Sequence, residues 1–322
     1  MAPAAQPGSL LARGSGSAGR PVIEPPPGEP AAELVARSLR DLGRHGPARV
    51  LTRLAGGSGS QVFLLDLDGQ HAVLKVTEDP SWYDRAAHEL AVYRELGQAL
   101  GEFLPDLVAG HRDAGAVRLL GEAHDRWPPA HALTNLAWVE LAARLGRLQR
   151  SPVPRPPLLR PRPWPSPGEL ADAVGGWTGH GFGALAARGA EQLRAGGQGA
   201  TGAGTVLMHG DCHVGNLLRG PGGRPLWVDW QEVCLGSGLD DLVFLWQRTE
   251  LDGAHPPRDA MTSAYARARA LPRDDDVRSA LAACELRLLL VAWAPFLRYG
   301  PEDRRQVLAH RLEELVDGGP QP

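Results

Sequence analysis

The pattern of apolar and polar positions in the first third of the chain predicts a small sheet. Residues 29–43 place apolar side chains at helical spacing and end at a glycine, which is typical of a helix. Residues 50–67 and 70–76 then switch to strand-like patterns, interrupted by a glycine-rich turn and by Asp68-Gly69, a pair that favours a tight hairpin. Three consecutive strands are therefore expected after the first helix.

A helix and a second hairpin complete this strand-rich region. Residues 81–100 carry apolar side chains roughly on one face, and residues 107–122 form two apolar runs that turn at Ala114-Gly115. We therefore assign residues 31–125 to a small N-terminal lobe. Residues 1–30 are rich in Pro, Gly, Ser and Ala, and this composition predicts a disordered leader.

The remaining residues, 126–322, predict a larger lobe that is mainly helical. Residues 130–150 form a strong helical pattern, and the Pro-rich residues 151–170 are expected to be a surface connection. A weaker helix follows near residues 184–194, and everything after Asp240 is helical in pattern. The predicted fold class is therefore α+β, with a small strand-rich lobe followed by a helical lobe.

Charge and cysteine content exclude several classes of protein. The 322 residues carry a formal net charge of -3, with 34 Lys and Arg against 37 Asp and Glu, so there is no basic excess for nucleic acid. Three widely spaced cysteines form no CxxC pair, which argues against a disulfide framework or a zinc site and favours a reducing cytoplasm. No run of about 18 apolar residues is free of charge, so no membrane span is expected.

The residues that carry chemistry gather in residues 207–218, LMHGDCHVGNLL. Asp211 and Asn216 lie here, and Asp229 follows at the end of an apolar strand. Because Mg²⁺ prefers oxygen ligands and keeps water and substrate phosphates as the rest, we expect Asn216 and Asp229 to hold this metal. Asp211 is then free to accept a proton from a hydroxyl nucleophile. The pattern predicts a phosphoryl-transfer loop.

The stretch HGDCHVGN followed by VDW resembles the aminoglycoside phosphotransferase family, and the resemblance covers about residues 45–300. It implies a bilobal protein-kinase-like fold and phosphorylation of a hydroxyl on a small molecule with ATP or GTP and Mg²⁺. Under it, Asp211 matches the catalytic aspartate, and Asn216 and Asp229 match the metal ligands. Asp241 in LDDL is the better match to the family's later Asp-Leu step, with Asp240 the alternative.

The same resemblance implies a nucleotide site in the first lobe. Lys75 in AVLKV matches the lysine of the third strand, and Glu89 matches its partner on the following helix. The nucleotide-covering loop corresponds to GGSGSQVF, with Gly57, Ser58, Gly59 and Ser60, and the adenine-binding linker to LLGEAH, with Glu122 and Ala123. Two positions depart from the family pattern: Gln149 stands where a helix often ends in Leu-His, and Cys212 replaces an apolar residue.

Several of these residues also have a purely structural interpretation. His209 is expected to brace the loop through hydrogen bonds, and His213 is not expected to bind metal because no second soft ligand lies at zinc spacing. Trp residues in apolar runs favour the core over substrate stacking, namely Trp227, Trp230, Trp246 and Trp293.

Other functions were weighed against this one, and the sequence disfavours a protein kinase and a non-catalytic nucleotide binder. A protein kinase needs a long activation segment, whereas eleven residues separate Asp229 from Asp240. A non-catalytic nucleotide binder predicts the loss of a key residue, yet Lys75, Asp211, Asn216 and Asp229 are all present. Among small-molecule acceptors, an aminoglycoside-like antibiotic is favoured, with a metabolic alcohol such as choline, homoserine or a sugar as the alternative. A polycationic antibiotic requires an acidic wall, and the candidates are Asp240, Asp241, Glu250, Asp252, Asp274, Asp275, Asp276 and Glu285.

Overall fold

The computed structural model describes residues 29–55, 59–196, 205–271 and 274–318. Gly57 and Ser58 of the predicted nucleotide-covering loop lie outside the described residues, as do residues 1–28 of the predicted leader. Helix α1 (Glu29–Asp41) starts just inside the segment assigned to that leader, so Glu29 and Pro30 are helical.

Five strands among the described residues form one antiparallel sheet, in the order β1-β2-β3-β5-β4. Their bounds are β1 Ala48–Leu54, β2 Ser60–Leu67, β3 Gln70–Thr77, β4 Leu107–Arg112 and β5 Val117–Glu122. The Asp68-Gly69 hairpin forms as expected, with φ of +54° and +82° at its two residues. Asp68 is one of the few residues other than glycine that adopt this left-handed conformation here.

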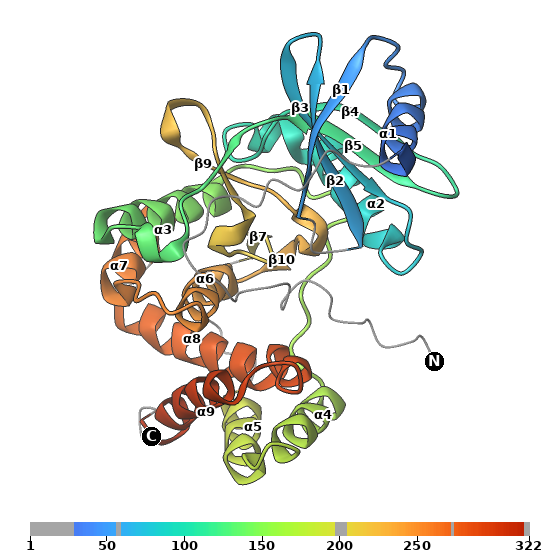
Figure 1. The fold of residues 1–322 in the computed structure, drawn as a ribbon. Helices are drawn as coiled ribbons and strands as arrows, with labels where there is room; N and C mark the ends of the chain where they lie inside the picture. The colour runs from blue at the N-terminus through green and yellow to red at the C-terminus, as the bar shows by residue number, and fades with distance from the viewer. Residues whose placement is uncertain (1–28, 56–58, 197–204, 272–273, 319–322) are drawn as a thin grey trace.

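One helix covers each face of this sheet (Figure 1). Helix α1 packs Leu34, Val35 and Leu39 on a cluster that includes Leu74 and Val76 of β3. Helix α2 (Tyr83–Leu100) packs on the opposite face, through Ala86 and Leu90 among others. Because successive side chains of a strand point to opposite faces, residue 75 is directed toward the α2 side. The sheet thus fixes the direction of Lys75 before any polar contact is considered.

The second part of the chain is mainly helical. Its helices are α3 Asn135–Arg150, α4 Pro167–Thr178, α5 Gly183–Gly196, α6 Leu239–Leu251, α7 Arg258–Arg269, α8 Asp274–Arg287 and α9 Glu302–Asp317. Its short strands are β6 Asp125–Arg126, β7 Val206–Met208, β8 Leu217–Arg219, β9 Pro225–Trp227 and β10 Cys234–Gly236. Single helical turns span Ala130–Ala132, Val214–Asn216, Pro221–Gly223, Trp230–Glu232 and Ala294–Phe296, and a π-turn spans Leu288–Ala292. This arrangement confirms the predicted α+β fold.

The core of the helical part contains the tryptophans that the sequence assigns to it. Trp227 and Trp230 are fully buried, and Trp246 and Trp293 are nearly so, which confirms their prediction as core residues. The hairpin of β8 and β9 turns at Pro221–Gly223, also as predicted. This hairpin places Asp229, just after β9, close to the end of the polar motif, just before β8.

Two predictions about this part were wrong in detail. The Pro-rich residues 151–170 are not wholly a surface connection, because Leu159 is a core residue and α4 begins at Pro167. A capping box at Ser166 and Glu169 starts this helix, with Ser166 Oγ accepting from the backbone of Glu169 at 3.2 Å. The apolar helix predicted over residues 277–300 is α-helical only as far as Arg287, continues as the π-turn Leu288–Ala292, and ends in the single turn Ala294–Phe296, where Pro295 has no backbone N–H to donate.

One helical stretch of the described chain, Val277–Phe296, is long and apolar enough to cross a membrane by length and composition alone. About two thirds of it, 67%, is buried inside the molecule. Its hydrophobic character is accounted for by packing in the core, where Leu288, Leu289 and Leu290 are all buried.

Candidate active site

The polar motif forms a loop that follows the short strand β7. Gly210 in this loop has φ +84°, and a Cβ there would lie 2.1 Å from the carbonyl oxygen of Glu232. Any other residue would therefore clash with the backbone as well as strain the left-handed conformation. The glycine permits the close approach of the loop to the segment after Asp229.

His209 holds this loop in place through hydrogen bonds to the backbone, as the sequence predicts. Its ring is fully buried, Nδ1 accepts from the backbone N–H of Asp211 at 3.3 Å, and Nε2 lies 3.0 Å from the carbonyl oxygen of Val228. These partners fit the tautomer that carries its proton on Nε2. Burial lowers the pKa of His209, so the imidazole is held neutral. A neutral imidazole that is hydrogen-bonded at both ring nitrogens is a structural element of the loop.

Asp211 and Asn216 face each other across the turn. The Asn216 amide nitrogen Nδ2 donates to Oδ2 of Asp211 at 3.1 Å and to its backbone carbonyl at 3.0 Å. Both side chains are buried, with 6% and 8% of the residue exposed. His213 lies beside the same carboxylate, with its Nε2 3.7 Å from Oδ2 of Asp211. The amide therefore orients the carboxylate that the sequence singles out.

Lys75 joins three distant parts of the chain. Its Nζ lies 2.7 Å from Oε2 of Glu89 on α2 and 2.9 Å from Oδ1 of Asp229, which is 154 residues away in the sequence. Burial alone would lower the pKa of Lys75, but the carboxylates of Asp229 and Glu89 outweigh it and raise the pKa well above its usual value. The pKa of Glu89 is raised by its own burial, with Lys75 opposing the shift. Lys75 stays charged between its two partners.

The backbone of Val228 links Asp229 to the polar loop. Val228 donates its N–H to the carbonyl oxygen of Asn216 at 3.0 Å, and its own carbonyl oxygen accepts a hydrogen bond from Nε2 of His209. Asp229 follows in the left-handed conformation, with φ +66°. The structure thus brings the predicted residues of the second lobe next to one another, and Lys75 and Glu89 join them from the first lobe.

The donor set suits a hard cation better than a soft one. No group of three or more His, Cys, Asp and Glu side chains that could hold a metal occurs in the described part of the chain. Asn216 and Asp229 instead offer an amide oxygen and a carboxylate, which is the kind of partial set that Mg²⁺ uses when water and phosphates complete its shell. The residues present therefore fit magnesium bound together with a nucleotide.

The described part of the predicted nucleotide loop is tightly packed. Gly59 has φ +63°, and a Cβ there would lie 2.2 Å from Cδ1 of Trp82. The Ser60 hydroxyl lies 2.7 Å from Oγ1 of Thr77 and so bridges β2 and β3. In the predicted linker, the N–H of Glu122 donates to Asp106 at 3.2 Å and that of Ala123 to His71 at 3.4 Å. Adenine recognition by these two residues would therefore use carbonyl oxygens.

Asp241 rather than Asp240 contacts the polar loop. Asp241 is buried and accepts from the backbone N–H groups of His209 at 2.8 Å and Gly210 at 2.9 Å. Its third donor is the Gln149 side chain, at 3.1 Å. Asp240 instead forms an ion pair with Arg287. The structure therefore favours the first of the two residues that the sequence leaves open.

Gln149 has a larger role than its departure from the family pattern indicates. Its amide nitrogen also donates to the carbonyl oxygen of Gly238 at 3.0 Å, and its amide oxygen accepts from the Tyr265 hydroxyl at 2.5 Å. Arg269 lies against the same pair, 2.9 Å from the Tyr265 oxygen. Sequence reasoning missed these partners on α7, because only the close packing of α3 against α7 brings them together.

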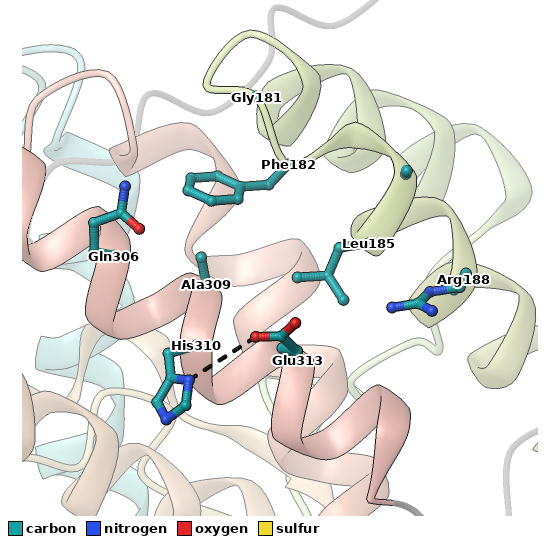
Figure 2. Close-up of a pocket in the computed structure, with 9 residues that line it drawn as sticks. Gly181, Phe182, Leu185, Arg188, Gln306, Ala309, His310 and Glu313 are labelled. Atoms are coloured by element: carbon teal, nitrogen blue, oxygen red, sulfur yellow. Dashed lines mark ion pairs between the residues drawn. The ribbon is translucent and has the colours of Figure 1, made fainter.

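A separate surface hollow lies between α5 and α9, well away from the polar loop (Figures 1 and 2). Figure 2 shows Phe182, Leu185 and Ala309 on its walls, with an ion pair between His310 and Glu313 at 3.9 Å along α9. The described residues that line it include no residue of the candidate active site. Its position separates it from the chemistry of Asp211 and Lys75.

Comparison with known proteins gives a family and a fold. Residues 50–281 match the model of the phosphotransferase enzyme family, while a search among curated proteins found no match. Among known structures, a choline kinase from Cryptosporidium parvum Iowa II is similar, with TM-score 0.63 and 14% identity, over 89% of this chain and 97% of that one. These values show a shared fold.

Two phosphotransferases are similar to about the same extent. A spectinomycin phosphotransferase in complex with ADP and spectinomycin has TM-score 0.61 and 16% identity, covering 89% of this chain and 96% of that one. A thermostable mutant of an aminoglycoside phosphotransferase, with AMP-PNP and hygromycin B, has TM-score 0.60 and 16% identity, covering 89% and 99%. The fold is the bilobal kinase-like fold, which confirms the expectation from the sequence. Since the family model spans well over half of the chain, this protein belongs to the phosphotransferase enzyme family and is a kinase that acts on a hydroxyl group.

Proposed function

We propose that this protein transfers the γ-phosphate of ATP or GTP to a hydroxyl of a small molecule, with Mg²⁺ and with Asp211 as the catalytic base. The observation that carries the proposal is the position of Lys75, 2.7 Å from Glu89 and 2.9 Å from Asp229, at the junction of the two lobes. In kinases, a lysine that lies between a glutamate of a helix and the aspartate that binds the metal orients the nucleotide phosphates.

Each charged residue of the site then has a defined task. Lys75 would contact the phosphates, and Glu89 keeps its ammonium in place and charged. Asn216, through its amide oxygen, and Asp229, through its carboxylate, would hold Mg²⁺. The metal supplies positive charge that neutralises the phosphate oxygens during transfer.

Asp211 is the group suited to act on the acceptor. The acceptor oxygen forms a bond to the γ-phosphorus as the bond to the bridging oxygen of the nucleoside diphosphate breaks, and the hydroxyl proton passes to the Asp211 carboxylate. Asn216 holds Oδ2 of this carboxylate at 3.1 Å, so the group is oriented before an acceptor binds. His209, buried and neutral, supports the loop and takes no part in proton transfer.

Membership of the family defines the reaction but not the chemical class of the acceptor. An aminoglycoside-like antibiotic, favoured by the sequence, would need unpaired acidic side chains on the helical lobe. In the structure, Glu250 binds Arg258, Glu285 binds both Arg258 and Arg311, and Asp252 lies 3.6 Å from Arg304. Asp240 and Asp241 are also engaged, while the side chains of residues 274–276 lie outside the described part.

These ion pairs favour the second acceptor class, a metabolic alcohol of low positive charge. A polycation would have to compete with arginines for carboxylates that are already neutralised. The test is a nucleotide-consumption screen of the full-length protein with Mg²⁺, using aminoglycosides, choline, homoserine and sugars as acceptors and both ATP and GTP as donors. Consumption that depends on an acceptor, and that fails in Asp211→Asn, is the expected result. Acceptor-dependent consumption that survives this substitution would refute the assigned mechanism.

A further inference from the structure

Residues 160–162 of the Pro-rich segment between α3 and α4 run beside strand β10. The backbone N–H of Leu235 donates to the carbonyl oxygen of Arg160 at 2.9 Å, and the N–H of Arg162 donates to the carbonyl oxygen of Leu235 at 2.8 Å. Pro161 forms a parallel bridge with Leu235 between these two bonds. Since β10 also pairs with β7, which leads into the polar loop, the segment is attached to the sheet that carries this loop.

The sequence of this stretch, RPRP at residues 160–163, favours the extended backbone that the attachment requires. Arg160 and Arg162 each precede a proline, and a residue in that position is restricted to extended conformations. Pro161 has no N–H, so the bonds to β10 use the carbonyl before it and the N–H after it. The prolines therefore restrict the backbone of Arg162 to a conformation that fits beside β10.

The Arg162 side chain extends from this stretch to the polar loop. Its Nη2 donates to the carbonyl oxygen of Gly210 at 3.4 Å, and the side chain is partly buried. Burial alone would lower the pKa of Arg162, but the acidic groups near it, Cys234 and Asp240 foremost, raise the pKa above its usual value. The guanidinium therefore stays charged, and its bond to the carbonyl is charge-assisted.

The carbonyl of Gly210 belongs to the same peptide unit as the N–H of Asp211. Arg162 holds the oxygen end of this unit, and Nδ1 of His209 accepts from the N–H end at 3.3 Å. The N–H of Gly210 itself donates to Asp241 at 2.9 Å, so the preceding peptide is held as well. No side chain restricts rotation about the backbone bonds of Gly210, so these hydrogen bonds define the orientation of the peptide.

We propose that Arg162 is a positioning residue for phosphoryl transfer, because it fixes the peptide from which the Asp211 side chain projects. The inference rests on the proposed function, since it takes Asp211 to be the base that acts on the acceptor. The contacts of Arg162 lie on β10 and the polar loop, whereas the nucleotide phosphates are expected at Lys75 and Asp229. Loss of the guanidinium should therefore slow transfer and leave nucleotide binding unchanged.

The direct test follows the Asp211 amide by NMR. Full-length protein that carries a nitrogen isotope label at its aspartates reports hydrogen exchange at each aspartate amide. Asp66 in β2, which pairs with β1 on one side and β3 on the other, is the internal reference. Arg162→Gln should speed exchange of the Asp211 N–H by at least about 10-fold and leave Asp66 unchanged. Equal acceleration at both amides would indicate a general loss of stability and count against a positioning role.

The rate of phosphoryl transfer is the second readout. Transfer to water from Mg·ATP or Mg·GTP, whichever the protein consumes, should fall by about 10- to 100-fold in kcat in Arg162→Gln, with an unchanged nucleotide Kd. Arg162→Lys keeps one charged donor on a shorter side chain and should fall between that variant and the parent. Arg160→Gln, at an exposed position that also precedes a proline, is the matched control and should behave like the parent.

Parental exchange of the Asp211 amide in Arg162→Gln, or parental turnover, would overturn the proposal. If this variant does not fold, Arg162→Lys takes its place, and parental exchange or turnover in it would overturn the proposal in the same way. Failure of the proposed function would show differently, as phosphoryl transfer that is unaffected by Asp211→Asn, because the exchange measurement requires no turnover.

Discussion

Gln149 donates from Nε2 to Oδ2 of Asp241 at 3.1 Å, and Asp241 in turn accepts the backbone N–H groups of His209 and Gly210. A side chain of α3 therefore supports the loop of Asp211 through a buried carboxylate of α6. Because both side chains are almost fully buried, each lost hydrogen bond leaves a polar group without solvent as a substitute. The loop geometry depends on this pair.

Replacing Gln149 by Ala should lower kcat more than it changes nucleotide binding. The Asp241 carboxylate would lose one of its donors, and we expect a fall of roughly 10-fold in kcat, with nucleotide affinity unchanged, because Gln149 acts on the loop through Asp241 and has no contact with the Lys75 site. Gln149→His should recover much of the activity, since an imidazole N–H can also donate to Asp241. Gln98→Ala, at an exposed position of α2, is the control. Equal losses in Gln149→Ala and Gln149→His would argue against positioning through this hydrogen bond.

Metal dependence should separate Asp229 from Asn216. Asp229→Ala removes a full negative charge from the cation site, whereas Asn216→Ala removes only a dipole, so the first variant should lose Mg²⁺-dependent nucleotide binding more completely. The measurement is nucleotide affinity at increasing Mg²⁺ concentration. Asp229→Ala also frees Lys75 from one of its two carboxylates, so Glu89→Gln serves as a comparison that disturbs Lys75 and keeps both proposed metal ligands. Two variants that bind Mg·ATP like the parent would contradict both assigned ligands.

The β4–β5 hairpin should contribute stability that depends on pH. Asp113 accepts from the N–H groups of Gly115 at 2.7 Å and Ala116 at 2.9 Å and from Arg118 at 2.6 Å. The backbone bond from Gly115, followed by the bond from Arg118, lowers the pKa of Asp113 from 3.8 to about 2. Since the folded-state pKa lies below the unfolded one, this stability is present above about pH 4 and is lost as the pH falls toward 2.

The corresponding measurement is thermal unfolding of Asp113→Ala and the parent between neutral and acid pH. The difference in Tm should be constant near neutrality and shrink as the pH drops below about 4. Asp172→Asn, at an exposed position of α4, controls for the loss of one carboxylate. A difference that grows on acidification would show that the hydrogen bonds to Asp113 are not the source of the stability.

Much of the fold could be predicted because its signals are local. Asp68-Gly69 specifies a hairpin by itself, and the alternation through β3 fixes the face of Lys75 without knowledge of its partners. The signal for the start of α4 is also local, because Ser166 and Glu169 form a capping box. It was missed because it lies within a Pro-rich segment.

The parts that escaped prediction depend on contacts between distant segments. Gln149 meets Tyr265 only because α3 packs on α7. Several of the acidic residues proposed for a polycation, such as Glu250 and Glu285, pair with arginines from other helices. Sequence spacing identifies a charged residue but does not show which opposite charge will reach it.

The central claim is that Asp211 is the base that activates the acceptor hydroxyl. Asp211→Asn keeps the shape of the side chain and removes the basic oxygen, so with any accepted substrate kcat should fall by about 10²- to 10⁴-fold while nucleotide affinity hardly changes. That loss corresponds to roughly 3 to 5 kcal/mol of transition-state stabilisation. The decisive measurement is the steady-state rate of this variant beside its nucleotide titration. A large loss of kcat with an unchanged nucleotide Kd is the predicted result, and turnover equal to that of the parent would contradict the account.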